Sequence, residues 1–381
     1  MLVPLNPIAS QTATGAFIVL LVAATAISVR KRQAGGFFPL SATNQIKGLA
    51  ILMVVFSHIG YFLTTDHDFL FPLSGMAGVG LNLFLLISGY GLTVSTLQKD
   101  LSVLQFYRRR LIKIVVPFWT VLALFFLLDL FVLHITYAPS YWVSSFLGFF
   151  HSANLYRDID SPLWYMTLII LYYVLFPLAF SKKYPWLSAV ALCAAGVGFL
   201  MWHPAIMDPV LWLYRTHIVA FPLGMIIGWL AVRMPQSKQQ LAVWLRSAYQ
   251  EVQEVLSYRP AARTVGYWVS VLGLLGVIGY FSVHSGVGTQ AEQFISIITV
   301  LALTALFLLS RVDIGLLTLF GVYSYEIYLF HWPLLYRYDI FFHFLPAWLA
   351  LAAYLILFIG LGQALQIFSH KATGWLFGKN A

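Results

Sequence analysis

Charged residues are scarce in this chain. Aspartate, glutamate, lysine and arginine make up 9% of it, whereas hydrophobic residues make up 61%. A soluble globular domain has about a quarter of its residues charged, so this composition predicts an all-α polytopic membrane protein. Cysteine is rarer still: Cys193 stands alone, which excludes a disulfide framework and a cysteine metal site. No histidines or acidic residues show metal-ligand spacing, and we predict no metal.

The basic residues fall in short segments between apolar runs, which argues against nucleic-acid binding despite a net charge of +9. The apolar runs predict eleven membrane-spanning helices, at residues 14–29, 46–63, 75–96, 114–134, 163–180, 186–202, 212–232, 265–283, 291–309, 314–336 and 346–369. With the N-terminus outside, all of the 22 lysines and arginines except Arg157, Arg215 and Arg337 lie on the cytoplasmic side. This excess follows the positive-inside rule and predicts the N-terminus out and the C-terminus in.

Two predicted loops are long. The outer loop, about residues 135–162, combines aromatic residues with Asp158 and Asp160. That combination suits sugar binding, but it also matches the aromatic belt of any membrane interface. The inner loop, about residues 234–263, has apolar residues at helical spacing, which predicts a helix lying flat on the cytoplasmic surface.

A histidine stands in the second predicted span. His58 follows Lys47 by eleven residues, so the two share a helix face about 16 Å apart along the axis. The hydrocarbon core is about 30 Å thick, so His58 is expected near its middle, where an ionisable group marks a functional site by default. Histidine suits general-base work near neutral pH. A core histidine bonded to a neighbouring hydroxyl or carbonyl is the alternative.

A basic run precedes Pro117. It contains Arg108, Arg109, Arg110 and Lys113, which is more charge than membrane orientation requires. Arg110 and Lys113 share a helix face. With Lys47 they would form a cytoplasm-facing cluster able to hold phosphates, either those of acyl-CoA or those of anionic lipid headgroups.

The tenth predicted span, residues 314–336, carries several polar residues. Ser324, Tyr328 and His331 share one face, and Glu326 is turned away from His331. A carboxylate and a histidine in such a helix predict a polar interior. Pro333 is expected to kink the outer end.

Together these segments resemble the signatures of membrane acyltransferase family 3. Residues 47–58 are similar to its first signature, an arginine followed after ten residues by a histidine, and residues 80–90 resemble its second. Arg110 to Lys113, before Pro117, resembles its Arg-x-x-Arg segment. Leu163-Trp164 and residues 324–333 match two further signatures. The motifs follow the family's order over about residues 40–370.

The resemblance implies a ten-helix acyltransferase core within residues 41–381, preceded by an extra helix and a basic linker in residues 1–40. It implies an enzyme that moves an acyl group, often acetyl, from cytosolic acyl-CoA to a hydroxyl of a cell-surface polysaccharide or a lipid-linked sugar. Acyl-CoA is then a co-substrate, and no cofactor is tightly bound. The bacterial inner membrane is the expected location, and nothing indicates an oligomeric state.

The resemblance also assigns residues. His58 would be the catalytic histidine, and the donor would be held by Lys47, Arg110 and Lys113. The other residues expected at the donor and substrate site are Arg109, Ser88, Asn82, Trp164, Tyr325, Glu326 and His331. Ser88, Asn82 or a tyrosine of the tenth span would stabilise the oxyanion. Either direct attack by the acceptor hydroxyl or a covalent acyl-enzyme intermediate fits.

The chain departs from the family pattern at four positions. Lys47 and Lys113 stand where arginine is usual, which keeps the charge but weakens bidentate phosphate binding. Asn82 occupies a position that is often acidic. Ile169 replaces a glutamate, whose role would be unfilled or pass to Glu326.

Two other classes of function stay open at this stage. A proton-coupled transporter or flippase for a polysaccharide precursor could use His58 and Glu326 as a proton relay. A structural subunit of a polysaccharide machine would make substitutions of His58 silent. Direct binding of CoA that weakens when Lys47 or Arg110 is replaced distinguishes the enzyme from both.

Overall fold

The structure, a computed structural model, describes residues 7–32, 38–59, 69–71, 73–99, 102–154, 157–236, 260–283, 291–310 and 312–377. The helix predicted on the cytoplasmic surface in residues 234–263 lies mostly outside these ranges. The helices, in chain order, are α1 (Pro7–Ser28), α2 (Leu40–Ile59), α3 (Ala77–Gln98), α4 (Val103–Phe131), α5 (Pro139–Phe146), α6 (Trp164–Ala179), α7 (Pro185–Trp202), α8 (Asp208–Arg215), α9 (Ala220–Gln236), α11 (Pro260–Val283), α12 (Glu292–Leu309), α13 (Gly315–Val322), α14 (Ser324–Tyr336) and α15 (Ala347–Phe377). Short 3-10 turns are η1 (Leu73–Gly75), η2 (Ser161–Leu163) and η3 (Ala205–Met207), and the strands are β1 (Val29–Lys31) and β2 (Val312–Ile314).

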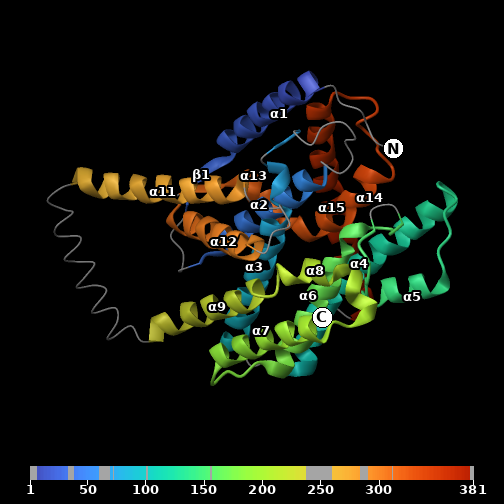
Figure 1. The fold of residues 1–381 in the computed structure, drawn as a ribbon, viewed down its shortest axis with the longest axis horizontal. Helices are drawn as coiled ribbons and strands as arrows, with labels where there is room; N and C mark the ends of the chain where they lie inside the picture. The colour runs from blue at the N-terminus through green and yellow to red at the C-terminus, as the bar shows by residue number, and fades with distance from the viewer. Residues whose placement is uncertain are drawn as a thin grey trace.

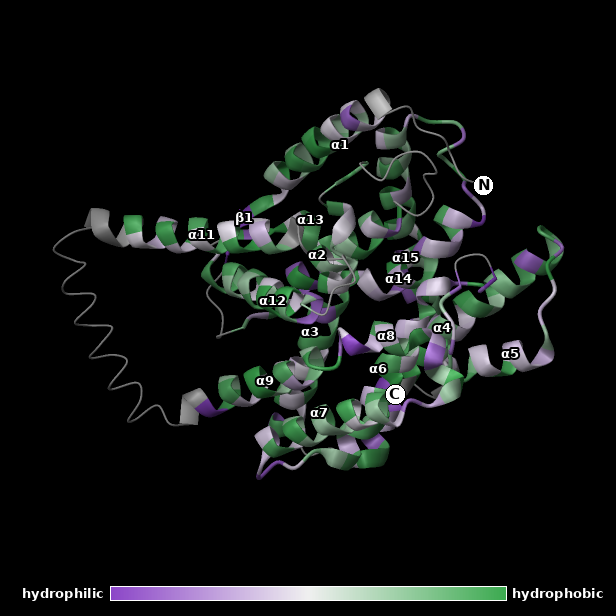
Figure 2. Cartoon of the chain, in the orientation of Figure 1, coloured by the Kyte–Doolittle hydropathy of each residue, from purple (hydrophilic) through white to green (hydrophobic). Residues whose placement is uncertain are grey.

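The long apolar helices confirm an all-α, polytopic membrane protein. Among the described residues, eight helices are long and apolar enough to cross a membrane: α1, α2, α3, α4, α6 with η2, α7, α12 and α15. The segment η3–α8 and the helix α9 pass the same test as a pair bent by 52°, which gives up to nine candidates. Their outward faces are apolar: Phe131 is 71% exposed, Trp202 75% and Ile356 73%. Figure 2 shows hydrophobic residues around the helices and hydrophilic ones mainly at helix ends and in loops. A soluble protein rarely exposes such extended apolar surface.

The helix α2 lies at the centre and packs against α3, α13 and α14, while α3 lies along α9 (Figure 1). Two glycines let the backbones of α2 and α13 touch. A β-carbon on Gly48 would lie 1.8 Å from the carbonyl oxygen of Leu317, and one on Gly321 would lie 1.8 Å from that of Asn44. Any larger residue at either position would force the two helices apart.

The predicted tenth span is not one continuous helix. The helix α13 ends at Val322 and α14 begins at Ser324, so the break comes well before Pro333, which lies inside α14. Tyr323, at φ −102° and ψ 13°, leaves the helical conformation, and the Ser324 hydroxyl donates to the carbonyl of Gly321 at 3.0 Å. Tight packing against α2 holds α13 in its own direction, a tertiary effect that no local pattern encodes.

The second span also differs from its predicted bounds of 46–63. The helix α2 starts six residues earlier, because the Gln45 side chain finds partners on β2: its Nε2 donates to Asp313 at 2.7 Å, and its Oε1 accepts from the Ile314 backbone at 2.8 Å. The described part of α2 runs to Ile59, with His58 in its last described turn, and residues 60–63 of the predicted span lie outside the described ranges. The strand β2 pairs antiparallel with β1, and this ribbon ties α1 to the bundle.

The helices α4 and α14 run parallel, side by side. Near the start of α14, the Tyr325 hydroxyl donates to the carbonyl of Ile114, in the first half of α4, at 2.8 Å. Near their ends, Arg337 pairs with Asp129. Ile114 and Asp129 are fifteen residues apart, about 22 Å along a helix axis. The pair therefore has two distinct polar ends, separated by aromatic packing such as that of Phe125 on Phe330.

Candidate active site

The structure brings His58 of α2 against His331 of α14. The His58 Nδ1 lies 2.7 Å from the His331 Nε2, and the rings stack with centroids 5.0 Å apart. The indole of Trp332 meets the His58 ring edge-on at 5.0 Å. His331 is fully buried, whereas His58 is partly accessible. Two histidines 273 positions apart in the chain thus form one hydrogen-bonded pair.

The partners of His331 fix the proton positions in this pair. Its Nδ1 lies 2.7 Å from the carbonyl oxygen of Tyr328, and a carbonyl only accepts, so that nitrogen carries a hydrogen. In neutral His331 the Nε2 is then the acceptor, and the His58 Nδ1 is the donor. Neutral His58 consequently holds its lone pair on Nε2. That atom is the one able to take a proton from a substrate.

The predicted donor cluster is partly assembled. Lys47 of α2, half-buried, lies within electrostatic range of Arg110 of α4, although 63 positions separate them. Lys113, one turn beyond Arg110, is exposed and lines a cavity of about 820 Å³ between α4, α14 and α15. Glu326 lines the same cavity. The side chain of Arg109 lies outside what the structure describes.

Asn82 takes part in a separate network. Its Oδ1 lies 2.8 Å from the His217 Nδ1, and its Nδ2 donates to the Ser296 hydroxyl at 2.7 Å and to the carbonyl of Thr216 at 3.1 Å. The ring of Trp164 lies against His217 with centroids 5.6 Å apart. These contacts place Asn82 and Trp164 together at the α8–α9 bend. Both ends of the Asn82 amide are engaged there.

The two remaining predicted residues have partners of their own. The Ser88 hydroxyl accepts from the Tyr173 hydroxyl at 3.4 Å. The Tyr325 hydroxyl donates to the α4 backbone, as described above. Tyr325 therefore fastens α14 to α4, at the end of the pair where the 820 Å³ cavity lies.

The segment predicted as the outer loop contains two buried carboxyl groups, those of Asp158 and Asp160, here called the outer acidic turn. The Asp158 carboxylate accepts from the Ser152 hydroxyl and the Asn154 backbone, both at 2.6 Å. Asp160 is buried, and its Oδ1 has no hydrogen-bond partner. Burial and, second, the charge of Asp158 raise the pKa of Asp160 well above its ordinary value.

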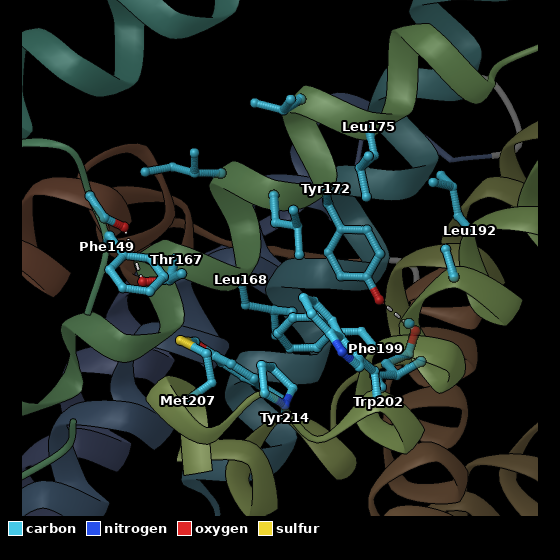
Figure 3. A pocket seen from close by; sticks show the side chains of 18 of the residues that line it. Phe149, Thr167, Leu168, Tyr172, Leu175, Leu192, Phe199, Trp202, Met207 and Tyr214 are labelled. Atoms are coloured by element: carbon cyan, nitrogen blue, oxygen red, sulfur yellow. Dashed lines mark hydrogen bonds between the residues drawn. The ribbon is translucent and has the colours of Figure 1, made fainter. Parts of the chain in front are cut away.

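A second cavity has the opposite chemistry. About 520 Å³ in volume, it lies between α6 and α7 (Figure 3), and its walls include Phe149, Leu168, Phe199 and Trp202. Among the residues that the structure describes, no acidic or basic side chain lines it. An apolar lining cannot stabilise phosphate groups, in contrast to the cavity beside Lys113.

Sequence reasoning missed several neighbours of these residues. His331 was expected at the site, but its contact with His58 was not. Four residues of α15 also line the cavity of Lys113 and were not predicted at the site: Gln366, Ser369, His370 and Lys371. Within the described residues, no three histidine, cysteine or acidic side chains gather as metal ligands would.

The fold defines a polytopic membrane protein that has a histidine pair between α2 and α14 and a cation-lined cavity between α4, α14 and α15. A family model described as "Acyltransferase domain" matches residues 41–366, and the chain belongs to this family, membrane acyltransferase family 3. It is accordingly a membrane acyltransferase. No curated protein and no solved structure matches the chain.

Proposed function

We propose that this acyltransferase moves an acyl group, acetyl by preference, from cytosolic acyl-CoA to a hydroxyl of a cell-surface or lipid-linked sugar. The observation that carries the proposal is the His58–His331 pair, which directs a lone pair of His58 to Nε2. Family membership favours an enzyme over a transporter, a flippase or a structural subunit. The acyl-CoA donor follows from the cations Lys47, Arg110 and Lys113, which suit phosphate groups.

The proposed topology has eleven spans in a bacterial inner membrane, with the N-terminus out and the C-terminus in. Eight of these spans are the candidate helices named above. Of the other three, one consists of α8 and α9, one consists of α13 and α14, and one is α11. Two contacts support it. Lys113 and Lys371, both assigned to the cytoplasm by the positive-inside rule, line one cavity, while Arg337, assigned outside, lies at the far end of α14.

In the proposed reaction, His58 Nε2 takes the proton of the acceptor hydroxyl as its oxygen attacks the thioester carbonyl carbon. The C–S bond breaks, an ester forms, and the CoA thiolate takes the proton back from His58 as it leaves. His331 acts as a positioning residue, because its Nε2 accepts from His58 Nδ1 and keeps the reactive tautomer. The proton taken from the acceptor hydroxyl thus leaves on the CoA thiol, and the reaction needs no covalent enzyme intermediate.

The donor is expected to reach His58 from the cytoplasmic end. Eleven residues of α2 separate Lys47 from His58, about 16 Å along the axis, a length comparable to an extended pantetheine arm. Phosphates held by Lys47, Arg110 and Lys113 would leave the thioester near the histidine pair. The acceptor would approach from the opposite side, where the outer acidic turn lies.

Mass spectrometry of surface glycans tests the proposal in cells that carry the wild-type chain or a variant. The wild type adds an acyl mass that cells without the protein lack, and His58→Ala abolishes it. His331→Leu lowers it about 100-fold, a typical contribution of positioned general-base catalysis, whereas His331→Gln, which offers an acceptor oxygen, retains more activity. His134→Asn, at an exposed histidine, serves as the control. An unchanged acyl mass with His58→Ala at equal protein level would refute the mechanism.

A further inference from the structure

The cavity between α6 and α7 has walls suited to a hydrocarbon guest. Its volume is about 520 Å³, within the size range of small-molecule pockets, and aliphatic and aromatic side chains make up most of its lining (Figure 3). Three hydroxyls line it as well, and each donates to a backbone carbonyl: Thr167 to Gly148 at 3.0 Å, Tyr172 to Ile218 at 2.8 Å and Tyr214 to Trp164 at 3.1 Å. Because a buried water needs two to four polar partners, this space favours an apolar guest over water or a polar ligand.

One side of the cavity is open to the surface of the helix bundle. Leu171 of α6 and Ala195 and Trp202 of α7 line the cavity and are exposed, whereas Leu168 and Leu192 in its opposite wall are buried. Both helices are candidate membrane spans, so the exposed side meets lipid. A hydrocarbon chain can therefore enter the cavity sideways from the membrane.

The cavity extends along one half of the two helices. Its lining runs from Thr167 to Leu175 on α6 and from Leu192 to Trp202 on α7, which is about 12 and 15 Å along the helix axes. One leaflet occupies about 15 Å of the hydrocarbon core. In the proposed topology Lys182 lies on the cytoplasmic side, at the other end of both helices. The cavity thus lies in the outer leaflet and matches one lipid chain in length.

Polar residues of the outer loop lie at the mouth of this cavity. Phe149 lines the cavity, and its ring stacks on that of His151 with centroids 6.0 Å apart. The next residue, Ser152, donates to Asp158 of the outer acidic turn at 2.6 Å. This turn leads directly into α6, where the ring of Tyr165 lies 5.9 Å from that of Tyr328. A chain held in the cavity therefore presents its head group to polar side chains, beside the helix that contacts the residue bonded to His331.

We propose that this cavity binds the hydrocarbon chain of a glycolipid whose sugar carries the acceptor hydroxyl. This inference rests on the proposed function and narrows its acceptor to a lipid-linked sugar. Bilayer and cavity are both apolar, so the chain gains packing contacts rather than hydrophobic free energy. The head group therefore selects the lipid, and imidazole and carboxyl groups at the mouth can bond its hydroxyls. Holding the chain restricts the sugar to the outer end of α6, which favours its encounter with the histidine pair.

Photolabelling tests whether the cavity holds such a chain. The probe is dodecyl glucoside with a photoreactive diazirine at the end of its chain, added to the full-length protein in phosphatidylcholine nanodiscs. Mass spectrometry of the labelled peptides is expected to show saturable labelling of α6 and α7 that unlabelled dodecyl glucoside competes away. This wild-type measurement depends on no variant.

A filling variant and a matched control locate the probe. Ala195→Phe places a ring in the cavity, where it competes with the chain for one space, and should raise the half-saturating probe concentration about tenfold. Ala194→Phe adds the same ring at an exposed position of α7 outside the cavity lining, and should leave that concentration within twofold. Labelling that does not saturate, or that is equal in the two variants, would identify bulk lipid and overturn the inference.

Acyl transfer in cells separates this inference from the proposed function. Wild-type cells should carry the acyl mass on lipid-linked sugars extracted with organic solvent, and Ala195→Phe should lower it about tenfold relative to Ala194→Phe at equal protein level. An acyl mass confined to polymeric surface glycans, or undiminished transfer by Ala195→Phe, would overturn the inference and leave the proposed function standing. Absence of any wild-type acyl mass on both lipid-linked sugars and surface glycans would overturn both.

Discussion

The two ends of the α4–α14 pair are built from similar residues but differ in how their polar groups are satisfied. At the end that the proposed topology places outside, here called the outer end, Asp129 is fully buried, and its carboxylate accepts from Tyr137 at 2.5 Å, from Tyr338 at 2.8 Å and from Arg337. At the inner end, Glu326 is almost as buried, yet one of its oxygens has no partner. Both oxygens of the Asp129 carboxylate have partners, whereas one oxygen of Glu326 has none.

This difference separates stability from function within one helix pair. A buried ion pair whose acceptors are all satisfied holds its two helices in place. Removing one partner is strongly destabilising, because the other charge is left buried and uncompensated. A buried carboxyl with an unmet oxygen weakens the fold and is kept where a site needs it. Substitutions at the two ends should therefore have opposite effects on stability.

The largest expected effect is at the outer end. Asp129→Ala leaves the Arg337 guanidinium, whose side chain is 7% exposed, without its carboxylate, and it should lower the free energy of unfolding by about 3–5 kcal/mol. Denaturant titration in micelles measures this. Asp129→Asn keeps the shape and part of the hydrogen bonding, so it should cost less. If Asp129→Ala cost under 1 kcal/mol, the outer end would not be the structural clamp that the contacts indicate.

The outer acidic turn is expected to make the free energy of unfolding depend on pH. Since burial raises the pKa of Asp160, the folded protein binds its proton more tightly than the unfolded chain. The stability that this protonated carboxyl contributes is fully present below the ordinary aspartate pKa near 4. It is lost as pH rises through the raised pKa, and the loss is about 1.4 kcal/mol for each unit by which the pKa is raised. Unfolding free energies measured from pH 4 upward should decline more for the wild type than for Asp160→Asn. Parallel curves would contradict this.

Glu326→Met tests the inner end directly. It removes the unmet carboxyl oxygen and fills similar volume with apolar atoms, so it should raise the free energy of unfolding by about 1 kcal/mol. The same variant should transfer acyl groups more slowly, because Glu326 lines the cavity beside Lys113, where the donor is proposed to bind. A variant that is both less stable and fully active would show that Glu326 is structural.

The smallest expected effect concerns the lysine where the family usually has arginine. Lys113→Arg offers a planar fork to a phosphate in place of a point charge, and it should tighten CoA binding about three- to tenfold, or roughly 1 kcal/mol. Lys183→Arg, outside the cavity, is the matched control. Titration of CoA into nanodiscs measures both, and equal affinities would place the donor phosphates away from Lys113.

The sequence predicted the long helices well, because the length of an apolar run can be read from neighbouring residues alone. Each predicted span corresponds to a helix or to a pair of helices, and His58, Lys47 and the Arg110–Lys113 run were identified as candidates from spacing alone. The break at Tyr323 was missed because residues 314–336 are continuously compatible with a helix. The break follows directly on the close contact of α13 with α2 at Gly48 and Gly321, a contact that only the folded chain contains.

Contacts between distant segments were beyond local patterns. His331 was expected to line a polar interior, but nothing in residues 324–333 indicates that its Nε2 meets His58. Ser369 closes the last predicted span and Lys371 lies just beyond it, and the structure places both around one cavity with Glu326. Asn82 shows the converse: its motif suggested the donor site, and its amide is engaged with His217 and Ser296.

The central claim is that His58 performs the chemistry while the inner end binds the donor. Single-turnover transfer from radiolabelled acetyl-CoA, in membranes that supply the acceptor, tests it when CoA affinity is measured on the same preparations. We predict that His58→Ala binds CoA within twofold of the wild type and transfers acetyl at least about 100-fold more slowly. Transfer by His58→Ala at the wild-type rate, with CoA binding intact, would contradict the account.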